Sequence, residues 1–269
     1  MSDIRIATAQ FENRSGDKEY NLRMIADLAR RASAAGAHVV AFHECSVTGY
    51  TFARKLTKEQ MLDLAEPIPQ GESIRRLIDI AAESSITILA GLFEKDDRGN
   101  LYKARVCVDK SGLKAKFRKL HPFINPHLLP GDRYVVFEIE GWKCGILICY
   151  DIQHPESARE LALGGAEIVF VPYCTDDFSR PLLVHLFQTR ALENRVFVVR
   201  VNYGTPRNSG TSSIIDYEGG TQDELDHVPG VLVGDLDLTA LRKVRADWDE
   251  VYGDHYRRPQ AYKRIPKSP

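Results

Sequence analysis

The sequence predicts an α/β fold built from mixed β-sheets. Short apolar runs of strand character alternate with amphipathic helical segments along most of the chain, which is typical of strand–helix–strand units. In the middle of the chain, glycine-containing turns separate neighbouring strands, so antiparallel pairing is expected as well. Two layers of sheet covered by helices would account for so many short strands. A length of 269 residues suits one domain, residues 1–269, better than two.

The first third of the chain consists of two strand–helix units. A strand at residues 4–11 precedes a helix at 19–35, whose apolar side chains recur every three or four positions until Gly36. A short apolar strand follows at residues 37–42. The second unit has a helix at 73–84 and a buried-type strand at 86–93.

Hairpins dominate the middle of the chain. Turn sequences at residues 97–100 and 110–112 flank expected strands at 101–109 and 113–117. A further hairpin pairs two strands around Gly141 and Trp142, and its second strand ends directly at Cys149. These two strands are expected at residues 134–140 and 143–148.

The last part of the chain returns to alternating helices and strands. Helices are expected at residues 156–163 and 182–193, and strands at 167–171, 196–201, 212–216 and 231–235. From about Ala246 the chain is polar and aromatic without clear periodicity. We expect this tail to pack on the domain or on a partner subunit.

The composition excludes several classes of protein. With 43% hydrophobic and 27% charged residues the chain is typical of globular proteins rather than disordered ones. A net charge of −1 predicts neither a nucleic-acid partner nor binding to an anionic membrane, so a small-molecule ligand is expected. The N-terminus has no apolar signal region and no apolar run approaches the roughly 20 residues of a membrane span, which predicts a cytoplasmic location.

The cysteines predict free thiols. There are five, an odd number, in a chain much longer than small disulfide-rich domains. No Cys-x-x-Cys pair occurs and the eight histidines are scattered, so no metal site is expected.

Three polar residues lie at or just after the ends of expected strands: Glu44, Lys119 and Cys149. Each has a structural explanation when taken singly, since a lone buried cysteine is usually inert. Together they match the needs of a thiol that attacks an amide, which are a proton acceptor, a cation facing the oxyanion and an exposed sulfur. The sequence therefore predicts a cysteine-dependent hydrolase.

Further segments, in order along the chain, carry a resemblance to a known family. They are Ala7-Thr8-Ala9-Gln10, Pro130-Gly131-Asp132, Cys149-Tyr150-Asp151 with His154-Pro155-Glu156, Arg190-Ala191-Leu192-Glu193-Asn194, and the segment 210–216. With the triad, they resemble the nitrilase superfamily of carbon–nitrogen hydrolases over nearly the whole chain. The resemblance implies a four-layer α-β-β-α sandwich, no metal or organic cofactor, and a homodimer or higher homo-oligomer.

The resemblance also implies roles for individual residues. Glu44 would take the thiol proton, Cys149 would attack the carbonyl carbon, and Lys119 would hold the oxyanion with the backbone N–H of Tyr150. Further candidates for oxyanion or substrate binding are Tyr50, His127, Cys174 and Asp176. Of these, Cys174 and Asp176 belong to a loop after an expected strand, where a substrate-side wall would lie.

The substrate class has several alternatives. A small linear amide that releases ammonia is favoured, because Cys149-Tyr150-Asp151 is similar to the amidase and carbamoylase branches, whereas true nitrilases typically have Cys-Trp-Glu. An N-carbamoyl amine or amino acid is the second alternative and a nitrile the third. A catalytically impaired relative that binds a metabolite is the alternative from another class.

One position departs from the family pattern. Many amidases of this family have a second glutamate eight residues after the lysine, where this chain has His127. We expect its imidazole to lie near the thiol as a neutral hydrogen-bond partner. The alternative is that the loop is packed differently.

Overall fold

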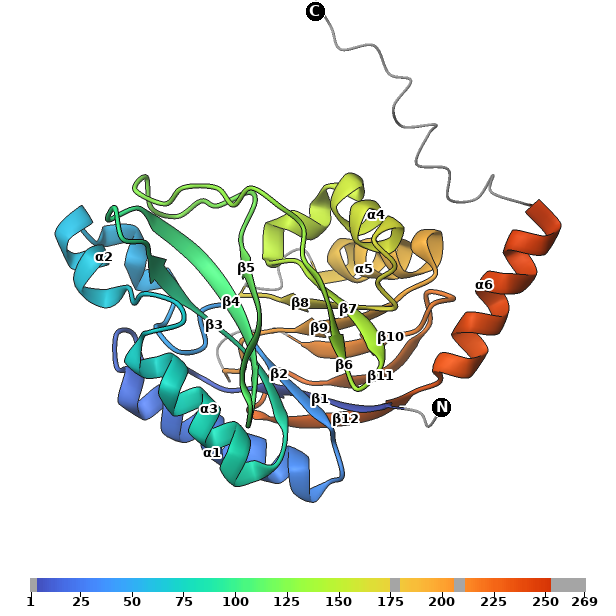
Figure 1. Ribbon diagram of the computed structural model, residues 1–269, viewed down its shortest axis with the longest axis horizontal. Helices are drawn as coiled ribbons and strands as arrows, with labels where there is room; N and C mark the ends of the chain where they lie inside the picture. Colours follow the sequence, from blue (N-terminus) through green and yellow to red (C-terminus); the bar gives the residue numbers. More distant parts are fainter. Residues whose placement is uncertain (1–3, 175–179, 206–210, 253–269) are drawn as a thin grey trace, which may run out of the picture.

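The computed structural model describes residues 4–174, 180–205 and 211–252. Two six-stranded sheets pack face to face, and helices cover both outer faces (Figure 1). The expected four-layer α-β-β-α sandwich is confirmed.

The first sheet consists of β1 (Ile4–Gln10), β2 (Val39–Phe42), β3 (Thr87–Lys95), β4 (Leu101–Asp109), β5 (Gly112–Arg118) and β12 (Gly230–Leu236). Its strand order is β12-β1-β2-β3-β4-β5. The pairs β1–β2 and β2–β3 are parallel, whereas the other three pairs are antiparallel. The sheet is therefore mixed, as the alternation of crossovers and hairpins predicts.

The second sheet consists of β6 (Val136–Ile139), β7 (Trp142–Ile146), β8 (Ile168–Pro172), β9 (Phe197–Val201), β10 (Ser212–Ile215) and β11 (Thr221–Leu225). Its strand order is β11-β10-β9-β8-β7-β6. The strands β7, β8 and β9 run parallel, and the outer pairings are antiparallel. Both sheets thus have a parallel centre, where strand ends converge at one edge.

Four helices form the outer layers. Helices α1 (Lys18–Ala34) and α3 (Glu72–Ser84) cover the first sheet, and α4 (Pro155–Leu163) and α5 (Arg180–Asn194) cover the second (Figure 1). The α1 helix begins where the Asp17 side chain accepts a hydrogen bond from the Tyr20 N–H. Its buried side chains are Asn21, Leu22, Ile25, Leu28, Ala29 and Ala32. Their helical spacing turns one apolar face to the sheet.

Several elements depart from the sequence prediction. The short helices η1 (Thr51–Lys55), α2 (Lys58–Leu64) and η2 (Cys149–Gln153), the polar edge strand β11 and the helix α6 (Leu238–Tyr252) were not expected. The α6 helix extends through the start of the segment that we expected to be an irregular tail from Ala246. It packs on the second sheet through Arg242, whose Nε donates to Glu167 Oε1 at 2.7 Å. Residues 253–269 lie outside the described part, so the packing of the tail stays a prediction.

The strand directions bring the candidate residues to one edge. Strand β5 is antiparallel to β4 and β4 is antiparallel to β3, so β5 runs in the same direction as β3 and β2. Lys119 after β5 and Glu44 after β2 therefore lie at the same edge of the first sheet. The Glu44 N–H donates to the carbonyl of Tyr173, just after β8, at 3.3 Å, which places this edge against the parallel strand ends of the second sheet.

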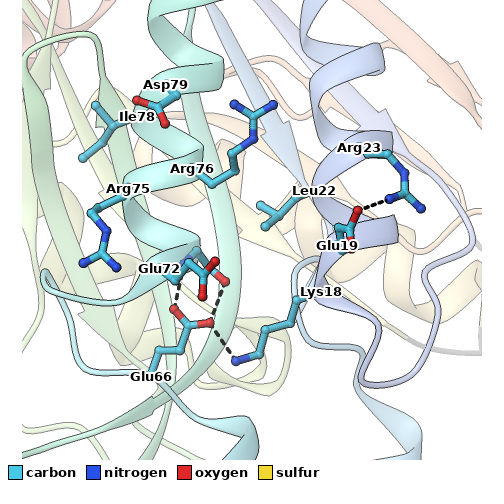
Figure 2. A pocket seen from close by; sticks show the side chains of 11 residues that line it. Lys18, Glu19, Leu22, Arg23, Glu66, Glu72, Arg75, Arg76, Ile78 and Asp79 are labelled. Atoms are coloured by element: carbon cyan, nitrogen blue, oxygen red, sulfur yellow. Dashed lines mark hydrogen bonds and ion pairs between the residues drawn. The ribbon is translucent and has the colours of Figure 1, made fainter.

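A separate groove of about 1020 Å³ lies between α1 and α3 (Figure 2). Four of its charged groups form two ion pairs: Lys18 Nζ lies 2.7 Å from Glu66 Oε1, and Arg23 Nη1 lies 2.6 Å from Glu19 Oε1. The groove is lined by none of the three candidate catalytic residues. No helix within the described ranges is long and apolar enough to cross a membrane.

Candidate active site

Glu44 follows β2 and is almost completely buried, with 1% of its surface exposed. The next residue, Cys45, has a left-handed φ of 51°, so the chain turns sharply there. Gly91 of β3 allows this turn, because a Cβ atom at Gly91 would come within 2.7 Å of the Cys45 nitrogen. The Gly91 carbonyl accepts a hydrogen bond from the Val47 N–H at 3.0 Å. The backbone behind Glu44 is thereby held against β3.

Lys119 follows β5 and is fully buried. Its backbone N–H donates to the Lys103 carbonyl at 2.8 Å, and its carbonyl accepts from the Gly131 N–H at 2.8 Å. A Cβ atom at Gly131 would overlap the Arg118 carbonyl oxygen, so only glycine permits this close approach. The anchored lysine places its Nζ 2.8 Å from Glu44 Oε1.

Cys149 is the first residue of η2. Two residues, Leu147 and Ile148, connect it to the end of β7. Its φ is 50°, a conformation that is uncommon for a side chain with a Cβ atom and that often marks functional turns. The residue is 6% exposed. Tyr150, the next residue, belongs to the first turn of η2, where backbone N–H groups have no partner within the helix.

Asp151 joins the lysine loop to the cysteine turn. Its fully buried carboxylate accepts from the Ile148 N–H at 3.1 Å through Oδ2 and from the His121 N–H at 2.9 Å through Oδ1. From the other side, Arg190 of α5 donates to the Ile152 carbonyl at 3.1 Å. These bonds fix Cys149 and Lys119 relative to each other.

Lys103, which no sequence motif singled out, also belongs to this cluster. It lies near the start of β4, is 1% exposed, and places its Nζ 3.0 Å from Glu44 Oε1. A signal was present in the sequence, because Lys103 and Arg105 occupy alternate positions in an otherwise apolar strand. Side chains two residues apart share a face of the sheet, so two cations on a buried face require partners.

The charges determine how the site is protonated. Burial opposes ionisation of Glu44, but the ammonium groups of Lys103 and Lys119 outweigh it and hold the pKa of the carboxyl below its ordinary value. Burial, reinforced by the Glu44 charge, raises the pKa of the Cys149 thiol to about 12 against the opposing effect of the two lysines. The resting site therefore holds a neutral thiol beside an ionised carboxylate.

A sequence model of the carbon-nitrogen hydrolase family matches residues 5–246. The chain belongs to this family. The nitrilase of Pyrococcus abyssi (strain GE5 / Orsay) is 31% identical over 97% of this chain and 100% of the relative. The (R)-stereoselective amidase of a Pseudomonas species is 30% identical over 91% of this chain and 89% of the relative.

A similar solved structure comes from the amidase of Nesterenkonia sp. AN1. It has a TM-score of 0.76 and 26% identity, and the match covers 93% of this chain and 99% of that one. That structure, of a mutant, shows the result of Michael addition of acrylamide at the active-site cysteine. The active-site cysteine of that amidase is therefore a nucleophile.

The other candidate residues of this carbon–nitrogen hydrolase differ in how deeply their side chains are buried. Tyr50 is buried, and Lys103 Nζ lies 4.2 Å from the centre of its ring. Cys174 is partly buried and packs with the apolar cluster that contains Cys45 and Tyr50. Tyr150 is 39% exposed. Asp176 lies outside the described residues.

His127 lies in the loop after Lys119, and its surroundings differ from those of the triad. Its side chain is exposed, whereas the triad is buried, and over the described residues its ring makes no hydrogen bond or ion pair. The cause is the Asn125 turn: the Asn125 amide donates to the carbonyls of Ala53 and Leu56, and its oxygen accepts from the His127 N–H at 3.0 Å. An exposed ring without such a partner favours the alternative that the loop is packed differently, and the role of His127 near the thiol stays a prediction.

We therefore expect His127→Ala to leave catalysis nearly unchanged. Removing an exposed side chain without a partner typically changes stability by no more than roughly 0.5 kcal/mol. A barrier change of that size would alter kcat only about twofold. The pH–rate profiles of wild type and variant should superimpose. If His127→Ala lost an acid limb that the wild-type profile shows, the imidazole would take part in catalysis.

Proposed function

We propose that the protein is an amidase that hydrolyses a small linear amide through a thioester on Cys149. The observation that carries this proposal is the buried cluster of Glu44, Lys119 and Cys149, in which Lys119 Nζ lies 2.8 Å from Glu44 Oε1 and the charge of Glu44 acts on the Cys149 thiol. Glu44 Oε2 has no hydrogen-bond partner in the part of the chain that the structure describes. This oxygen is available to accept the thiol proton.

The first half of the reaction forms the thioester. The Cys149 sulfur bonds to the amide carbon as its proton passes to Glu44 Oε2, and the carbonyl oxygen becomes an oxyanion. Lys119 and the Tyr150 N–H stabilise that charge. The oxyanion then collapses, the carbon–nitrogen bond breaks, and Glu44 returns the proton to the nitrogen, which leaves as ammonia.

The second half hydrolyses the thioester. Glu44 takes a proton from water as the water oxygen bonds to the acyl carbon, and the same donors stabilise the second oxyanion. Its collapse breaks the carbon–sulfur bond and returns a proton to the sulfur. The products are a carboxylic acid and the original thiol, so no cofactor is needed for balance.

The substrate class can be tested with a panel of short aliphatic amides, ω-amido acids, N-carbamoyl amines, N-carbamoyl amino acids and nitriles. We expect ammonia release and a thioester adduct detectable by mass spectrometry with amides. The family membership and two amidase-named proteins support this choice, and the nitrilase-named relative keeps nitriles in the panel. Turnover of N-carbamoyl compounds or nitriles, without turnover of amides, would reassign the substrate.

Trapping with iodoacetamide tests the alternative of a metabolite-binding protein without catalysis. We expect Cys149 to be alkylated fastest of the five thiols, because Glu44 can take its proton. Burial raises the pKa of Cys45 and Cys107 to about 12, and neither thiol has a hydrogen bond to a carboxylate among the described residues. Peptide mass spectrometry at neutral pH measures the five rates. Equal rates would favour the binding protein.

We further propose that the protein is a cytoplasmic homo-oligomer, at least a dimer. The exposed apolar side chains of Leu192 on α5 and Val251 on α6 support this, because apolar groups on outer helices gain from being covered. Light scattering should give at least twice the chain mass of 30.3 kDa at micromolar concentration. A mass near one chain would refute the oligomer.

A further inference from the structure

We propose that Lys103 is a positioning residue of this site, which holds Glu44 Oε1 together with Lys119 and so leaves Oε2 as the proton acceptor for Cys149. The inference rests on the proposed function and adds a residue to it. The reaction steps are unchanged, and the proton still moves from the sulfur to Oε2 and then to the leaving nitrogen.

The backbone places the two lysines side by side. The Lys119 N–H donates to the Lys103 carbonyl, which extends the pairing of β4 with β5 by one residue. Like charges on neighbouring strands repel each other, and more strongly where water is excluded. Here both ammonium groups pair with one oxygen. Lys119 donates a hydrogen bond to it at 2.8 Å, and Lys103 forms an ion pair with it at 3.0 Å without hydrogen-bond geometry. Glu44 Oε1 is therefore held from two directions.

Aromatic rings confine the Lys103 ammonium. Its Nζ lies 4.2 Å from the centre of the Tyr50 ring and 5.3 Å from that of Phe123, which also lies 4.8 Å from Lys119 Nζ. Such ring faces attract cations. Because the lysine is 1% exposed, its ammonium cannot exchange Glu44 for water without moving these rings.

A purely structural role would not require this residue. An apolar side chain at a buried strand position is often as stable as a buried ion pair, since desolvating the charges is costly. A second ammonium beside Glu44 has a chemical effect instead. It opposes protonation of the carboxylate at rest, and it makes the proton that Glu44 accepts during catalysis easier to pass to the leaving nitrogen.

Other charged and titratable groups also act on Glu44, from every element around it. Lys103 and Arg105 lie on β4, and His43 and Cys45 are the chain neighbours of Glu44. The remaining groups follow β5, β7 or β8, or directly precede η1. In full they are His43, Cys45, Tyr50, Lys103, Arg105, Lys119, Cys149, Tyr173 and Cys174. Burial lowers the pKa of His43 to about 3, so this imidazole stays neutral throughout the range in which Lys103 can be tested.

The test measures the rate of Cys149 alkylation by iodoacetamide from pH 4 to 8, which needs no substrate. While Glu44 is ionised and accepts the thiol proton, the rate should be independent of pH, and it should fall where Glu44 becomes protonated. In wild type we expect this fall below the ordinary carboxyl pKa of 4.5. In Lys103→Met it should move upward by at least about one pH unit, the effect of removing an opposite charge at this distance.

Three companion variants keep the result interpretable. Lys103→Gln also removes the charge and serves if Lys103→Met does not fold, whereas Lys103→Arg keeps the charge and should return the fall toward the wild-type pH. Lys116→Met is the matched control, because Lys116 Nζ lies 2.6 Å from another buried carboxylate, Glu94, and makes no contact with Glu44. We expect this control to retain the wild-type profile.

The outcomes separate this proposal from the proposed function. Superimposable profiles for wild type and the charge-removing variants, with amide turnover intact in wild type, would overturn the role of Lys103 and leave the amidase standing. The expected shift in a protein that hydrolyses no amide would support Lys103 while overturning the substrate class. A shift of equal size in Lys116→Met would overturn the specific role of Lys103.

Discussion

Replacing Cys149 by alanine is expected to abolish amide turnover and to leave the fold intact. The thiol is the only group proposed to form a covalent bond with substrate, so kcat should fall by roughly 10⁴-fold or more when it is removed. The side chain contributes one buried sulfur atom, and its loss should cost only about 1 kcal/mol of stability. Ammonia release and thermal unfolding measure the two effects.

Cys107→Ala is the matched control. Cys107 is as buried as Cys149, lies between the two sheets, and makes no contact with Glu44 or Lys119 among the described residues. The substitution removes the same atom, so it should cost a similar amount of stability while kcat stays near the wild-type value. An active Cys149→Ala enzyme would reassign the nucleophile.

Much of the fold was predictable because periodicity reports burial. The strands of the parallel centres are apolar on both faces, and the helices that cover them carry one apolar face, so both kinds of element are visible in the sequence. Strand β11 was missed because its side chains are mostly exposed and polar, and only pairing with β10 makes it a strand. Helix α6 was missed because charged residues interrupt its apolar positions.

The site was predictable where residues are close to a strand end. Glu44, Lys119 and Cys149 each lie within three residues of a strand end, and strand direction brings Glu44 and Lys119 to one edge of the first sheet. Position in a loop is a weaker guide. His127 was assigned by counting from Lys119, but the hydrogen bonds of Asn125 determine how that loop turns. Lys103 was missed because it lies within a strand rather than after one.

Replacing Glu44 by glutamine is expected to affect both activity and stability. Loss of the proton acceptor should lower kcat by at least about 10²-fold. The same change leaves the ammonium groups of Lys103 and Lys119 buried without a counter-charge, and breaking a buried ion pair in this way costs about 3–5 kcal/mol. Steady-state kinetics and denaturant unfolding measure the two losses.

The Glu66→Gln variant separates the loss of activity from the loss of stability. Glu66 is also buried and paired, with Lys18 Nζ at 2.7 Å and the Ser73 hydroxyl at 2.6 Å, but it lines the groove between α1 and α3 (Figure 2). We expect this variant to lose stability and to keep kcat. If Glu44→Gln also lost stability but kept its kcat, Glu44 would be a structural carboxylate, and another group would have to accept the thiol proton.

The dependence of stability on pH provides a further check on Glu44. Because its pKa is lowered in the folded protein, its ion pairs contribute fully above the ordinary value of 4.5, and the contribution is lost as the pH falls through the folded pKa. The difference in unfolding free energy between wild type and Glu44→Gln should therefore be constant from pH 8 to about 5 and should shrink at lower pH. A difference that already shrinks between pH 8 and 6 would mean that Glu44 is protonated near neutrality, and a carboxyl in that state could not accept the thiol proton.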